Sequence, residues 1–168
     1  MLESLITSKT RLRLLIKFFL NITNKGYLNG LANEFGESTN SVRKELNNLS
    51  SAGYLEKYNH NNKVVYKANT THPLFKVIQR IVKKHLGIEE ILETVLKRIG
   101  EVKKIMILGD YAEGIDSGHI EILIVGDYIS EDYLKEITPK IEKKINRKVS
   151  FFVSNSTLKQ KTLTIFEA

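Results

Sequence analysis

The spacing of apolar residues changes at Gly53, and this change restricts the fold more than any other feature of the chain. Before Gly53, three segments repeat apolar residues every three to four positions, which is the period of a helix with one buried face. After it, residues 54–58 and 64–67 are rich in β-branched and aromatic residues, and residues 59–63 between them favour a turn. This order predicts three helices followed by a β-hairpin. The helical stripes are Leu12, Leu15, Ile16 and Phe19; Leu28, Leu31, Ala32 and Phe35; and Val42, Leu46 and Leu49.

A short turn is predicted between the second and third helices. Gly36 permits the left-handed backbone that ends a helix, and Ser38 or Thr39 can cap the helix that follows. Two short helices joined by about three residues fit a helix-turn-helix. With the hairpin behind it, the segment 1–70 is predicted to be a winged helix.

The third predicted helix has a polar face that suits DNA. In a helix-turn-helix, the second helix of the pair places polar side chains in the major groove. Arg43 and Lys44 can meet phosphates or guanine edges, and asparagine can pair with adenine through two hydrogen bonds. Residues at the hairpin tip could reach neighbouring phosphates or the minor groove. The candidate DNA-binding residues are Thr39, Asn40, Ser41, Arg43, Lys44, Asn47, His60 and Lys63. The alternative is an ordinary solvated helix face.

Charge is distributed unequally along the chain. Residues 1–86 contain 14 Lys and Arg against 5 Asp and Glu, a balance of +9, whereas residues 87–168 contain 12 against 14, a balance of −2. The asymmetry favours a module that binds a polyanion at the N-terminal side, here double-stranded DNA, although a solvated basic face would give the same count. One winged helix offers few base contacts, so we expect a homodimer that reads two half-sites.

Several classes of protein are excluded by composition. The chain has no cysteine, which excludes disulfides, thiol catalysis and zinc sites built on cysteine. No apolar run approaches the ~18 residues that a membrane-spanning helix needs, and the first residues do not resemble a signal peptide. We therefore expect a cytoplasmic protein without membrane contact.

The second half alternates helices and strands. Two amphipathic stripes in the connector 71–100 begin after Pro73, which suits the first turn of a helix. One of these stripes is expected to pack internally and the other to face a partner chain. Strands are predicted over 105–108, 119–125 and 149–153, with a helix from Ser130 to about Ile145 and a glycine-bounded turn over 109–114. Residues 101–168 therefore predict a small mixed-sheet domain, and the whole chain an α+β fold. The tail from residue 157 is ambiguous.

Two motifs carry a family resemblance. The turn Gly109-Asp110-Tyr111-Ala112-Glu113-Gly114, followed by the strand His119-Ile120-Glu121-Ile122-Leu123-Ile124-Val125, resembles the signature of minimal nucleotidyltransferases. The run Val65-Tyr66-Lys67-Ala68-Asn69, leading to His72-Pro73-Leu74-Phe75, resembles prokaryotic regulators that join an ArsR-like winged helix to such a domain. In that family a Gly-Ser turn holds the triphosphate, and two aspartates one residue apart hold two magnesium ions.

The departures from the family pattern predict a degenerate enzyme. Asp110 stands where the family has serine, and His119 and Glu121 stand where it has the two aspartates. Strand 149–153 supplies no third carboxylate, and one carboxylate with a histidine cannot hold paired magnesium ions. We therefore expect no catalytic residues, no metal and no cofactor. Gly109, Asp110, His119 and Glu121 are expected to be a vestigial nucleotide site; the alternative for Asp110, Asp116 and Glu121 is solvated polar residues.

The leading hypothesis is a sequence-specific DNA-binding transcriptional regulator. Its C-terminal nucleotidyltransferase-like domain would act in sensing a small-molecule or protein effector, in dimerisation or in partner binding. One alternative is an active nucleotidyltransferase of the toxin–antitoxin type that carries a DNA-binding domain. Another is a protein-interaction module. The paired carboxylates that would favour the first alternative are missing, whereas the basic helix that favours the regulator is present.

Overall fold

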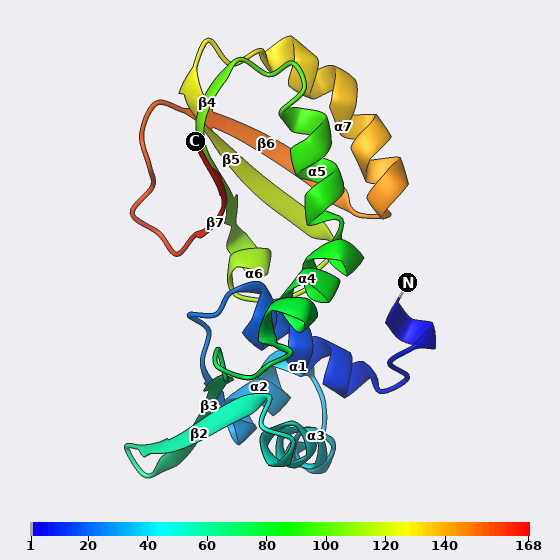
Figure 1. The fold of residues 1–168 in the computed structure, drawn as a ribbon, viewed down its shortest axis with the longest axis vertical. Coiled ribbons are helices and arrows are strands. Elements are labelled where there is room, and N and C mark those ends of the chain that lie inside the picture. The colour runs from blue at the N-terminus through cyan, green and yellow to red at the C-terminus, as the bar shows by residue number, and fades with distance from the viewer. Residues whose placement is uncertain (1) are drawn as a thin grey trace. The chain divides into compact units, whose positions relative to one another are not determined.

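The computed structural model describes residues 2–168 and contains both helices and strands (Figure 1). The predicted α+β class is confirmed: there are two separate sheets, and one of them is mixed. The chain divides into two units, the first ending at His85 and the second comprising Leu86–Ala168. The predicted connector 71–100 is thus shared between the units. None of the helices within residues 2–168 is both long and apolar enough to cross a membrane.

The first unit follows the predicted order of helices and hairpin, with one small strand added. A short 3-10 helix, Leu2–Ser4, precedes α1 (Lys9–Leu20), β1 (Gly26–Tyr27), α2 (Leu28–Phe35), α3 (Thr39–Ser51), β2 (Leu55–His60), β3 (Lys63–Ala68) and α4 (Phe75–Leu86). The three strands form an antiparallel sheet in the order β1-β3-β2. The predicted stripes face the core, where Phe18 and Phe19 of α1 and Val42 and Leu46 of α3 are almost fully buried.

The turn between α2 and α3 is built as its residue types predict. Gly36 has φ +63°, the left-handed conformation that ends α2. Ser38, one of the two predicted candidates, caps α3, and its Oγ accepts a hydrogen bond from the backbone N–H of Ser41 at 3.2 Å. These two residues set the start of α3 and the short distance to α2.

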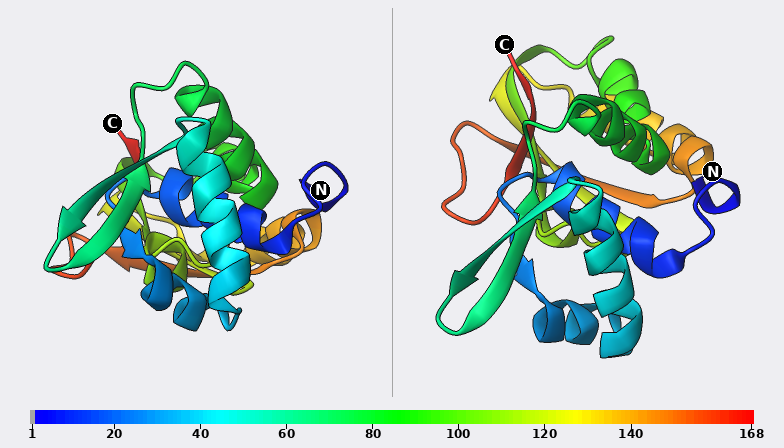
Figure 2. Two further views of the ribbon diagram at one scale, coloured as in Figure 1. Left: turned by 90° about the horizontal axis from the view of Figure 1, so that it is seen from below. Right: turned by 60° about the horizontal axis from the view of Figure 1, so that its bottom comes forward.

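The β2–β3 hairpin extends beyond the helices of the first unit (Figure 2). Asn61 and Asn62 form its tip with φ values of +48° and +61°. Two successive left-handed residues make the type I′ turn whose twist matches that of paired strands, and asparagine tolerates this conformation better than most residues. The predicted turn is therefore confirmed, with strands longer than predicted.

The second unit is a four-stranded sheet with two longer helices on one side of it (Figure 1). Its strands β4 (Glu101–Leu108), β5 (His119–Asp127), β6 (Lys148–Ser154) and β7 (Leu163–Glu167) lie in the order β6-β5-β4-β7. Only β5 and β6 are parallel, because α7 (Glu131–Ile145) crosses over between them. The helix α5 (Ile88–Val95) packs against α7 through buried Ile88, Ile91 and Val95.

Two local predictions beyond residue 70 need correction, and the tail that the sequence left ambiguous contains a strand. Pro73 lies before α4 and not in its first turn, because His72 closes a turn there by accepting a hydrogen bond from the Leu74 N–H at 3.1 Å. The glycine-bounded turn begins as a single helical turn, α6 (Gly109–Ala112). The ambiguous tail supplies β7, which pairs with β4.

Candidate nucleic-acid interface

One face of α3 is entirely available to solvent. The six residues predicted to bind DNA from this helix are all exposed, whereas Val42, Leu46 and Leu49 on the opposite face are buried. The structure therefore brings the six together on a single surface. They are Thr39, Asn40, Ser41, Arg43, Lys44 and Asn47, called here the α3 surface.

Three of the four cations of α1 are neutralised inside the first unit. Arg11 pairs with Glu45 at 2.8 Å, and this carboxylate also accepts a hydrogen bond from Ser8. Arg13 pairs with Glu37 at 2.7 Å. Lys17, itself buried, pairs with Glu34 at 2.8 Å. Three of the five acidic residues counted before residue 87 are therefore occupied in holding α1 to its neighbours.

The cations of the α3 surface are different, because no carboxylate neutralises them. The Arg43 guanidinium donates a hydrogen bond to Asn40 Oδ1 at 3.0 Å, which is a neutral partner. Within the described residues neither Arg43 nor Lys44 forms an ion pair. The positive charge of this surface is therefore free to attract an anion, and phosphate is the anion that such a pair of cations meets in DNA.

The two predicted hairpin residues, His60 and Lys63, are exposed but engaged in local contacts. His60 and Lys63 are paired across the strands next to the tip, and both are exposed. His60 contacts the Asn61 amide at 3.2 Å. The Lys63 ammonium lies 4.0 Å from the centre of the Tyr27 ring, so its side chain is folded against the sheet.

The predicted vestigial site is a cleft in the second unit, and three of its four residues line it. Gly109, Asp110 and Glu121 surround a cavity of about 720 Å³ whose floor includes Leu108 and Leu123. Gly109 has φ +61°, a conformation that favours glycine, and the absence of a Cβ atom there lets Glu121 Oε2 lie close to the backbone. Glu113, which was not predicted as a site residue, also lines the cleft and pairs with Lys161 at 3.0 Å.

His119 does not join this cleft. Its Nε2 lies 2.7 Å from Ser150 Oγ on the neighbouring strand, which engages the imidazole in a local contact. Among residues 2–168, no three His, Cys, Asp or Glu side chains are grouped so that they could hold a metal ion. The cleft therefore presents the carboxylates of Asp110, Glu113 and Glu121 without a metal cage.

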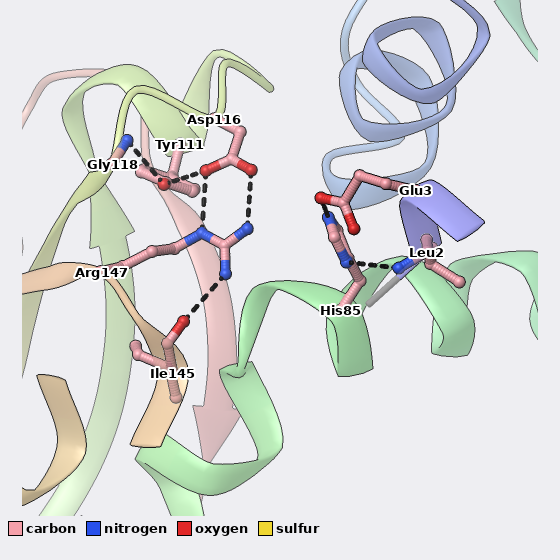
Figure 3. A network of polar contacts seen from close by, with 8 residues as sticks. All are labelled: Leu2, Glu3, His85, Tyr111, Asp116, Gly118, Ile145 and Arg147. Carbon is pink, nitrogen blue, oxygen red and sulfur yellow. Dashed lines mark hydrogen bonds and ion pairs between the residues drawn. The ribbon is translucent and has the colours of Figure 1, made fainter. Parts of the chain in front are cut away.

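A polar network that the sequence did not reveal joins the loop after α6 to the start of β6 (Figure 3). Asp116 accepts hydrogen bonds from Arg147 Nε at 2.9 Å and Nη2 at 2.8 Å, and also from the Tyr111 hydroxyl. That hydroxyl accepts the Gly118 N–H at 2.9 Å. Burial first, and then the hydrogen bond to Asp116, raise the pKa of Tyr111; the same carboxylate raises the pKa of Arg147.

The alternative interpretation of Asp116 as a solvated polar residue holds only in part, because the residue is exposed but its carboxylate is held in an ion pair. Its carboxylate holds the 113–118 loop in place through a two-pronged ion pair with Arg147. Arg147 is 31 positions further along the chain. No local periodicity or spacing links two residues so far apart, and so no sequence signal could have found this pair.

The chain has one weak structural match among known proteins. No family model matches the chain, and no curated protein matches it. One solved structure, that of Sso10a-2, a DNA-binding protein from Sulfolobus solfataricus, aligns with 50% of this chain and 85% of its own, at 17% sequence identity and a TM-score of 0.35. A likeness of this size does not establish a shared fold.

Proposed function

We propose that the first unit is a winged-helix domain that binds double-stranded DNA, and that the protein is a sequence-specific transcriptional regulator. In this proposal α3 enters the major groove, and the β2–β3 hairpin is the wing beside it. The resemblance to ArsR-like regulators belongs to the same proposal.

The observation that carries the proposal is the unneutralised charge of the α3 surface. Arg43 and Lys44 remain without carboxylate partners among the described residues, although three cations of α1 in the same unit have them. Exposed asparagine and threonine side chains accompany them, and these types read base edges. A solvated structural face would not require the cations and the base-reading side chains to be gathered on one helix beside a hairpin.

Dimerisation is part of the proposal, with α4 as the contact. Of the two stripes predicted in the connector, that of α5 buries Ile88, Ile91 and Val95 inside the second unit. On α4, Val82 and Leu86 are likewise buried, but Val77 and Ile81 are exposed, and so is Leu74 just before the helix. A second copy would cover these side chains and place two α3 surfaces on one DNA molecule.

We further propose that the second unit transfers no nucleotide and acts in sensing, dimerisation or partner binding. Asp110 and Glu121 place negative charge where a triphosphate would have to sit, whereas Glu113 is paired with Lys161. Incubation of the protein with radiolabelled nucleoside triphosphates and magnesium or manganese should label neither the protein nor proteins of a cell extract. Labelling that is lost in Glu121→Gln would overturn this and favour the active transferase.

Selection from fragmented genomic DNA tests the regulator proposal. The full-length protein should retain a small set of fragments that share a sequence, and a duplex of that sequence should bind at least a hundredfold more tightly than a shuffled duplex. Arg43→Ala should lower the affinity for the selected duplex by roughly 1–3 kcal/mol if it reads a base. Retention of fragments without any shared sequence would contradict sequence-specific regulation.

A further inference from the structure

The sheet of the first unit has a solvent-facing side that the α3 surface does not include. Tyr27 of β1 and Tyr58 of β2 are both paired with the same residue, Val65 of β3. Residues directly opposite each other in antiparallel strands project to the same face of the sheet. The two rings therefore share one face, and they remain exposed at 36% and 37%. The other face carries Leu55, Tyr66 and Ala68, which are buried in the core.

Three lysines place their ammonium groups over these two rings. Lys63 Nζ lies 4.0 Å from the centre of the Tyr27 ring, and Lys25 and Lys67 lie 5.8 and 5.7 Å from that of Tyr58. We call these five residues the tyrosine–lysine face. Glu56 is on the same side and pairs with Lys67 at 3.6 Å. Three positive charges and one negative charge leave a balance of +2 on this side of the sheet.

The Tyr27 ring is held in one orientation by α2. A Cβ atom on residue 30 would lie 3.0 to 3.4 Å from three atoms of this ring, so Gly30 lets the ring lie close against the helix backbone. The Lys63 ammonium lies over the same ring, 4.0 Å from its centre. The ring is thus fixed before any ligand arrives, which lowers the entropy cost of stacking on it.

Exposed rings with lysines around them suit single strands better than duplexes. In a duplex the flat faces of the bases are stacked on one another, and only groove edges and phosphates are accessible. A single strand offers unstacked bases and phosphates together, and aromatic side chains in a basic groove are the usual way to bind it. An exposed cation–π contact is weaker than base stacking, so a base can replace a lysine over the ring while the lysine turns to a phosphate.

We infer that the tyrosine–lysine face binds single-stranded nucleic acid. Bases stack on Tyr27 and Tyr58, and the phosphates pair with Lys25, Lys63 and Lys67. This is a second binding activity. It shares Lys63 with the residues predicted to bind duplex DNA but none of the six residues of the α3 surface, and it does not depend on that proposal being correct.

The test uses the full-length protein and a fluorescein-labelled oligothymidylate of about twelve nucleotides, within the ~4–16 nucleotides that one small domain covers. Fluorescence anisotropy at low salt should show binding. Tyr58→Ala and Tyr27→Ala should each weaken it about tenfold, whereas Tyr58→Phe, which keeps the ring, should not. Tyr128→Ala is the matched control, because it removes a tyrosine that is 89% exposed in the second unit.

The outcomes separate this inference from the duplex proposal. Arg43→Ala should weaken duplex binding and leave oligothymidylate binding unchanged. Tyr58→Ala should weaken oligothymidylate binding and leave duplex binding unchanged. Thermal unfolding checks that each variant is folded; if Tyr27→Ala is not, Tyr58→Ala and Lys67→Gln carry the test. No binding of oligothymidylate, or equal affinities for Tyr58→Ala, Tyr128→Ala and the unaltered protein, would overturn the inference.

Discussion

The α3 surface and the cleft beside Gly109 carry charges of opposite sign. The charges of α3 are cations on an exposed helix face, and those of the cleft are carboxylates that line a cavity. On α3, Arg43 and Lys44 are exposed and have no carboxylate partner among the described residues. In the cleft, Asp110 and Glu121 add negative charge to a cavity with an apolar floor. A polyanion is attracted to the first and repelled by the second.

The comparison teaches that the count of charges matters less than their partners. The first unit owes its basic balance to 14 cations, but three of the four in α1 are paired with Glu34, Glu37 and Glu45. The second unit likewise uses Asp116 and Arg147 to fix a loop. Of the cations in the first unit that are not paired in this way, two lie on the α3 surface and three on the tyrosine–lysine face.

The largest expected effect comes from separating two copies of the α3 surface. Val77→Gln combined with Ile81→Gln should convert a dimer into a monomer, because both side chains are exposed and apolar on α4. Loss of the second DNA contact should then lower the affinity for a selected duplex by about 10²–10⁴-fold. Sedimentation and anisotropy measure the two effects.

Leu96→Gln is the matched control for this prediction, since Leu96 is an exposed apolar residue of the second unit. It should leave both the mass and the affinity unchanged. A monomer of 19.2 kDa in the unaltered protein at tens of micromolar would contradict the α4 dimer.

A smaller effect is expected from Arg147→Ala, which tests whether the charges of the second unit are structural. Removing the guanidinium leaves the Asp116 carboxylate without its two-pronged partner, and the pair is only slightly exposed. The free energy of unfolding of the second unit should fall by about 2–3 kcal/mol. Lys140→Ala, which breaks an exposed pair with Glu136, should change it by less than ~0.5 kcal/mol in the same urea titration. Equal losses in the two variants would show that the network is not structural.

The free energy of unfolding at high pH should also depend on the network of Tyr111, Asp116 and Arg147, with a smaller effect than that of Arg147→Ala. The pKa of Tyr111 in the folded state is raised above its ordinary value of 10.0 by burial and by Asp116. Below that pH both states are protonated and the stabilisation is complete; above it the unfolded state loses its proton first, so the free energy of unfolding falls. Tyr111→Phe should remove this part of the fall, which urea titrations between pH 9 and pH 11 can measure. Parallel curves for the two proteins would contradict it.

Elements with a clear apolar period could be predicted from the sequence, and residues that act through distant partners could not. The stripes of α1, α2 and α3 and the cap at Ser38 follow from local preferences, and all are found in the structure. The strand β7 has no such pattern of its own, because its place depends on pairing with β4. Its existence therefore stayed ambiguous.

The same distinction applies to the candidate sites. The α3 surface lies on one helix, so its six residues could be gathered from helical spacing alone. The tyrosine–lysine face combines β1, β2 and β3, and β1 is only two residues long, too short to give a pattern. Tyr27 therefore could not be placed beside Tyr58 without the register of the sheet.

The salt dependence of duplex binding tests the central claim most directly. The affinity of the full-length protein for a selected duplex should fall steeply with salt, because the cations of α3 release counterions from phosphates. Arg43→Ala combined with Lys44→Ala should reduce the slope of log affinity against log salt by about one to two. Arg13→Ala should leave it unchanged, because Glu37 already neutralises that residue. A slope that is unaffected by the α3 variant, or reduced equally by Arg13→Ala, would contradict the claim that unpartnered charge on α3 binds DNA.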